Sequence, residues 1–148
     1  MASAGPVPPE TVQIAEESYR RCGHEAFFHS FYRRLLGSDE SIRSKFARTD
    51  FERQNKLLQH GLGLLFIYAK RGNPSLLERI ATRHGPGDVD VAPSLYPLFV
   101  DSLVATVKEF DTLCSPEVEQ AWRQALAPGI AFMCAHYTKH AGLPAAES

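Results

Sequence analysis

One histidine stands where its imidazole could bind a metal. His84 is followed by residues 85–87, Gly-Pro-Gly, through which a helix cannot continue. Leu77, Ile80 and Ala81 share its face of the preceding helical segment, so the imidazole should project from an apolar side. Neutral imidazole is a common metal ligand, and its second nitrogen could donate to the carbonyl near Ile80. Taken alone, however, a histidine at a helix end is more simply explained by the helix dipole.

The other five histidines and the three cysteines show no comparable pattern. Cys22, Cys114 and Cys134 are odd in number and widely spaced, which matches neither a disulfide framework nor a zinc-binding motif. We expect three reduced, partly buried thiols, the usual state in a cytosolic protein. Four of the histidines are interpreted as surface or helix-end residues: His24, His29, His136 and His140.

Helix signals extend over almost the whole chain, and no segment alternates apolar and polar residues as a strand would. The pattern predicts helices over residues 10–22, 24–36, 50–71, 73–84, 92–110 and 115–139, with a short helical segment over 38–46. Gly23, Gly37 and Gly72 are expected to end helices. Thr49 and Glu52 have the spacing of a capping box at the start of the long helix. The sequence therefore predicts an all-α fold of six to eight helices.

Length and charge limit the kind of protein this can be. The 148 residues suffice for one core, and the 44% hydrophobic content argues against a disordered chain. The net charge of −1 predicts no nucleic-acid or membrane partner, because both favour a basic excess. The apolar run over 62–69 is far shorter than the roughly 20 residues of a membrane helix. We expect one domain over 10–140, disordered tails over 1–9 and 141–148, and, without a signal peptide, a cytoplasmic location.

An ordered set of aromatic and polar residues precedes His84. Tyr32 lies in the second helical segment, and Phe46 comes fourteen residues after it. Gln54 and Leu58 lie one turn apart on one face of the long helix. His84 comes thirty residues after Gln54. The spacing thus places these side chains on three consecutive helical elements.

Further motifs follow His84 and complete a family pattern. A loop leads to Pro93-Ser94-Leu95-Tyr96, and Ala121-Trp122 lies in the last helix. The complete set, over about residues 10–140, resembles the globin family. The match is closest to bacterial single-domain globins and the haem domain of flavohaemoglobins, and globin-coupled sensors are also similar. The resemblance implies a globin fold packed around one haem b (iron protoporphyrin IX), with His84 as the proximal ligand of the iron.

The resemblance also implies roles for the other members of the set. Phe46, Leu58 and Tyr96 would contact the haem together with the proximal histidine. Tyr32 and Gln54 would donate hydrogen bonds to a ligand on the distal side of the iron.

Each of these residues also has a simpler interpretation. Tyr32 could be a buried tyrosine bonded to a backbone carbonyl, and Gln54 a solvated residue in the first turn of its helix. His60 competes as a distal residue, but it lies six positions beyond Gln54 and therefore off its face. The apolar members could be ordinary packing residues: Phe46, Leu58, Tyr96 and Trp122.

The function implied by the resemblance is reversible binding of O2, CO and NO, with high O2 affinity because two donors would slow its release. A competing function is that of a nitric-oxide dioxygenase or related redox enzyme, which would need an external reductase because the sequence ends at Ser148. Residues 135–139 contain no acid that could pair with Tyr96, so a peroxidase-like effect on the iron is not expected. A gas sensor and a haem-free helical interaction domain are two further functions open to a chain of this kind. Monomer and homodimer both remain open.

Overall fold

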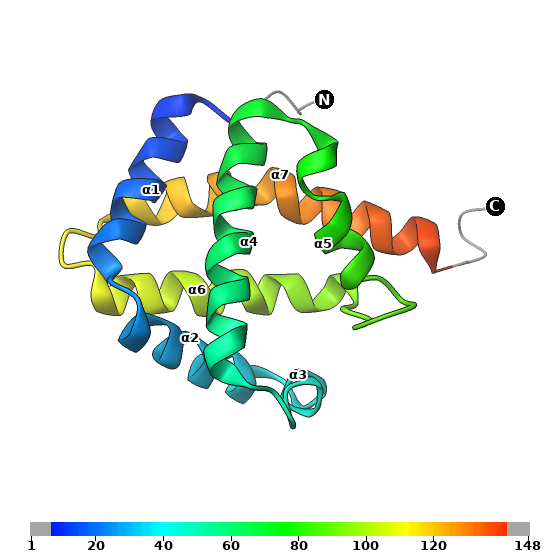
Figure 1. Ribbon diagram of the computed structural model, residues 1–148. Coiled ribbons are helices and arrows are strands. Elements are labelled where there is room, and N and C mark those ends of the chain that lie inside the picture. The colour runs from blue at the N-terminus through cyan, green and yellow to red at the C-terminus, as the bar shows by residue number, and fades with distance from the viewer. Residues whose placement is uncertain (1–6, 142–148) are drawn as a thin grey trace.

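The regular elements of the protein are helices throughout the part of the chain that the structure describes, residues 7–141 (Figure 1). In this computed structural model seven α-helices follow one another within the described residues: α1 (Pro9–Cys22), α2 (Glu25–Ser38), α3 (Glu40–Lys45), α4 (Phe51–Arg71), α5 (Glu78–Arg83), α6 (Tyr96–Phe110) and α7 (Pro116–His140). Short 3-10 turns, η1 (Pro74–Leu76) and η2 (Pro93–Leu95), precede α5 and α6. The predicted all-α class is confirmed. No described helix has both the length and the apolar character needed to cross a membrane.

The helices cross one another instead of lying parallel in a bundle. Figure 1 shows α4 passing across α6 and α7, with α5 beside α4. α1 and α4 both pack on α7, while α2 packs on α6. α5 and α6 also pack on α7, so α7 contacts four other helices of the described chain. This arrangement leaves α4 and α5 facing each other above α6 and α7.

Helix boundaries follow the sequence signals with three corrections. Gly23 and Gly72 end α1 and α4 as predicted, with φ of 76° and 70°. Gly37 does not end α2, which continues to Ser38, and the carboxylate of Asp39 then caps α3. The cap of α4 is Asp50, not Thr49, because its carboxylate accepts from the backbone N–H groups of the second and third helical residues.

The third correction concerns the helix predicted over 73–84. It is divided into η1 and α5, and Asn73 caps only the 3-10 turn, through a bond from the N–H of Ser75. Of the expected tails, residues 1–6 and 142–148 lie outside the described range. Val7 donates to the carbonyl of Ala69 at 3.1 Å and α1 begins at Pro9, so the ordered domain begins before residue 10.

A glycine in α7 allows the helices above it to come close. A Cβ at Gly129 would overlap Cδ2 of Leu65 on α4 and would lie 3.5 Å from Cδ1 of Leu77, just before α5. Leu77 is fully buried and Leu65 nearly so. α4 and the segment that leads into α5 therefore meet α7 at the same residue.

The core also contains one buried carboxylate, Asp111, between α6 and α7. It accepts from Ser18 Oγ at 2.6 Å, from Arg21 Nε at 2.6 Å and Nη2 at 2.8 Å, and from the N–H of Leu113 at 3.0 Å. Trp122 Nε1 in turn donates to Ser18 Oγ at 2.9 Å. Burial alone would raise the pKa of Asp111, but these hydrogen bonds and the Arg21 charge outweigh it and hold the pKa below its ordinary value. The network ties α1 to the α6–α7 connection and to α7.

We expect Asp111→Asn to lower the unfolding free energy by about 2 kcal/mol near neutral pH, the scale of hydrogen bonds to a buried charged group. Because folding depresses this pKa, the stabilisation is fully present above the ordinary value of 3.8 and is lost as the pH falls through the folded value. Urea unfolding of the wild type and Asp111→Asn, repeated from neutral to acidic pH, measures the difference in their unfolding free energies. The difference between them should shrink below about pH 4. A difference that stays constant with pH would show that Asp111 acts by packing alone.

Candidate functional site

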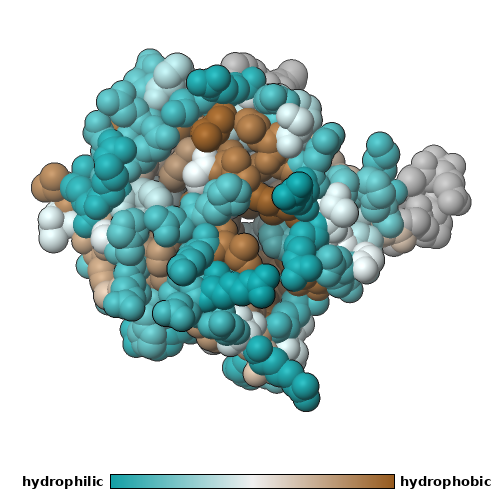
Figure 2. All heavy atoms as spheres, viewed as in Figure 1, coloured by the Kyte–Doolittle hydropathy of each residue, from teal (hydrophilic) through white to brown (hydrophobic). Residues whose placement is uncertain are grey.

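A hollow opens near the middle of the face seen in Figure 2, over the space between α4 and α5. Hydrophobic side chains surround it, and hydrophilic ones form its outer rim. The elements beside it carry expected site residues: Gln54 and Leu58 lie on α4, and His84 is the C-terminal cap of α5. The hollow is thus bordered by the two elements that the sequence predicted would face each other.

His84 has the properties of a neutral buried imidazole. Its pKa is lowered by burial and by the charge of Arg83, against an opposing effect of Asp88. Its Nδ1 is buried without a hydrogen-bond partner among the described residues. The side-chain bond predicted toward the carbonyl of Ile80 does not form; that carbonyl accepts from the backbone N–H of His84 at 3.0 Å, and Nδ1 has no partner. An imidazole that is neutral, largely buried and unpaired at one nitrogen suits a metal ligand.

Tyr32 and Gln54, predicted as the two distal donors, lie together. Tyr32 is only 5% exposed, and its ring lies 5.6 Å from that of Phe46 and 5.2 Å from that of Phe51. Burial raises the pKa of Tyr32 to about 12, although the nearby Gln54 side chain acts to lower it. The hydroxyl therefore keeps its proton at neutral pH. The structure brings together an O–H and an N–H donor from different helices.

Phe51 is a packing residue of this region that the sequence analysis missed. Its ring stacks on that of Phe46 at 5.9 Å, and both rings contact Tyr32. Phe51 is the first residue of α4. It stands directly after the capping Asp50, and an apolar residue in the first turn was the only signal that could have indicated it.

The remaining predicted residues divide between the hollow and its surroundings. Leu58 is half-buried on α4, whereas His60 is exposed, which is consistent with the preference for Gln54 over His60. Tyr96 is buried in a separate small cluster with Ala81 of α5 and Met133 of α7. Burial is the main cause that raises its pKa, and no carboxylate contributes to the shift, in keeping with the missing acid in α7.

The loop that follows His84 is held at both ends of its span. The N–H of Val91 donates to the carbonyl of His84 at 2.9 Å, and Lys45 Nζ at the end of α3 donates to the carbonyl of Val89 at 3.3 Å. Asp90 has a φ of 61°, and its Oδ1 accepts from the hydroxyl of Tyr137 on α7 at 2.6 Å. No sequence pattern pointed to this pair, which joins residues 47 positions apart.

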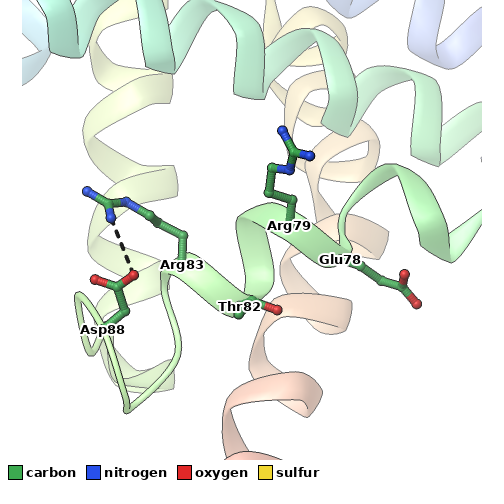
Figure 3. A pocket seen from close by; sticks show the side chains of 5 residues that line it. All are labelled: Glu78, Arg79, Thr82, Arg83 and Asp88. Atoms are coloured by element: carbon green, nitrogen blue, oxygen red, sulfur yellow. Dashed lines mark hydrogen bonds and ion pairs between the residues drawn. The ribbon is translucent and has the colours of Figure 1, made fainter.

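A second depression, of about 450 Å³, lies on the outer side of α5 (Figure 3). Arg83 pairs with Asp88 at 3.3 Å, and Arg79 extends separately toward α4. Glu78 points away from both arginines. Thr82 completes the lining. The depression is open to solvent and is lined by none of the predicted site residues, so the hollow between α4 and α5 is the candidate site.

Comparison with known proteins supports a family assignment at the level of structure. No protein-family model matches the chain, and no curated protein matches it. A crystal structure from Pseudomonas aeruginosa does match, and its protein is described as structurally highly homologous to a human hemoglobin. The two chains are 37% identical with a TM-score of 0.83, and the match covers 86% of this chain and 98% of the other.

Tyr137→Phe removes the hydroxyl that holds Asp90 and should loosen the loop between His84 and α6. We expect faster amide hydrogen exchange at Val89, Asp90 and Val91, with unchanged exchange in the core of α6. Tyr68→Phe is a matched control, because its ring packs on Phe132 away from this loop. Equal protection of the loop in all three proteins would show that the Tyr137 bond does not restrain it.

Proposed function

Because this chain belongs to the globin family, we propose that it is a haem protein that binds a diatomic gas reversibly, O2 in particular. The observation that carries the proposal is the buried imidazole of His84, with an unpaired nitrogen, at the end of a helix bordering a hydrophobic hollow. Haem held there by His84 would supply an iron with one coordination position open to O2, CO or NO.

Apolar and basic side chains would hold the rest of the haem. Phe46 and Leu58 offer half-buried hydrophobic surface beside the distal donors and would exclude water from the ligand. Arg79 extends from α5 toward α4 and forms no ion pair with another described residue, so it is free to meet the haem carboxylates. The sequence lacks a Cys-x-x-Cys-His motif for covalent attachment, which favours haem b.

The two distal donors would determine how long O2 stays bound. Tyr32 keeps its hydroxyl proton and lies beside Gln54, so both can donate to a ligand that accumulates negative charge. Such bonds in an apolar pocket contribute about 1.5–3 kcal/mol each. CO gains less because its oxygen carries little charge. Slow release of O2 favours chemistry or sensing over oxygen delivery.

Absorption spectra test the haem and its ligand. We expect the purified chain, supplied with hemin if needed, to show a Soret band that shifts sharply when CO is added to the reduced protein. His84→Ala should lose this response, whereas His60→Ala, an exposed histidine on α4, should retain it. A chain without a Soret band after hemin addition would contradict the proposal.

Stopped-flow kinetics test the distal donors separately. Loss of one hydrogen bond in Tyr32→Phe should speed O2 dissociation by about tenfold to a hundredfold. CO dissociation should change much less, and Tyr68→Phe should leave both rates unchanged. If O2 leaves Tyr32→Phe at the wild-type rate, the hydroxyl does not reach the ligand.

A further inference from the structure

The last turns of α7 carry two imidazoles stacked on each other. The rings of His136 and His140, four residues apart, have centroids 4.1 Å apart and planes inclined by 30°. Phe132, one turn earlier, stacks on His136 at 6.3 Å. The pair is separate from His84 in sequence and takes no part in the site described above. Two histidines one turn apart on a helix can chelate one metal ion.

The hydrogen bonding of this pair leaves nitrogens free for a ligand. Nδ1 of His140 lies 3.0 Å from the backbone carbonyl oxygen of His136. Since a carbonyl only accepts, Nδ1 carries the proton and donates, and Nε2 keeps its lone pair. A ring nitrogen that donates to a backbone carbonyl is the usual second contact of a metal-ligating histidine.

A carboxylate faces the pair from α5. Glu78 lines the same pocket of about 490 Å³ as His136 and His140, together with Lys139. Figure 3 shows Glu78 turned away from the nearby arginines, and it forms no ion pair with any described residue. The pKa of His136 is lowered by burial and by His140 and Lys139, against an opposing effect of Glu78. The pocket therefore brings one carboxylate from α5 together with two imidazoles from α7.

We propose that His136 and His140 bind one divalent transition-metal ion of the Zn²⁺ class, with Glu78 as the facing carboxylate. Imidazole is a common ligand of Zn²⁺. The negative charge of Glu78 would attract the cation and offset the repulsion from the positive charge of Lys139 in the same pocket. The described residues contain no group of three or more His, Cys, Asp or Glu side chains placed to hold a metal ion, so the two imidazoles would be the protein ligands and water would complete the coordination. The site is weaker than a four-ligand structural zinc site for this reason.

Calorimetric titration of the untagged chain with Zn²⁺ at neutral pH tests this. We expect one equivalent to bind, and His136→Ala and His140→Ala each to weaken binding by roughly tenfold or more because a direct ligand is lost. Glu78→Gln should weaken it less. His29→Ala, an exposed histidine on α2, should bind Zn²⁺ like the wild type.

Two further measurements separate this site from other ligands in the chain. His60→Ala, at an exposed histidine on α4, should bind Zn²⁺ like the wild type, which would show that histidines outside α7 do not account for the binding. Co²⁺ should give a visible spectrum without a thiolate charge-transfer band, because no cysteine takes part. Equal binding by the wild type and a correctly folded His140→Gln variant, a thiolate band, or no binding at all would each overturn the proposal.

Discussion

The packing of α7 at Gly129 is the constraint on which the candidate site depends. Leu65 of α4 and Leu77, at the entry to α5, both reach the space that a side chain at this position would fill. The two helices that border the hollow are therefore seated on the same point of a third helix. Protein interiors are close-packed, so neither border can shift without displacing a buried leucine. The width of the hollow is thus a property of the core beneath it.

Polar networks fix the surrounding helices without entering the hollow. Asp111 ties α1 to the α6–α7 connection, and Arg34 of α2 bonds to Glu109 and Thr106 of α6. The Asp90–Tyr137 bond does the same for the loop after His84. These contacts hold the helices in place, and the buried Asp111 and Ser18 do so within the core. The candidate site is left mainly to aromatic and aliphatic side chains. Tyr32, Gln54 and His84 then provide the polar atoms there.

The two kinds of helix-end histidine in this chain differ in their surroundings. His84 ends a short helix against the apolar interior, and its Nδ1 lacks a partner. His136 and His140 end a long helix near the surface, stack on each other and share a backbone hydrogen bond. Their local sequence contexts predicted helix-end positions for all three. The difference comes from the tertiary structure. Burial leaves Nδ1 of His84 without a partner, whereas His136 and His140 share a surface pocket with Glu78.

The sequence by itself determined the helical class, the ends at Gly23 and Gly72, and the spacing of Tyr32, Gln54 and His84. These features depend on local backbone preferences and on helical periodicity, which short stretches of sequence specify. It did not determine which of two adjacent residues caps α4, or that the helix before His84 is divided. The alternative caps and helix boundaries differ little in local free energy, and tertiary packing outweighs that difference. Only the tertiary structure decided that Phe51 packs on Tyr32 and that Tyr137 holds Asp90. Those contacts join residues from separate helices, and no local pattern specifies which distant side chain completes them.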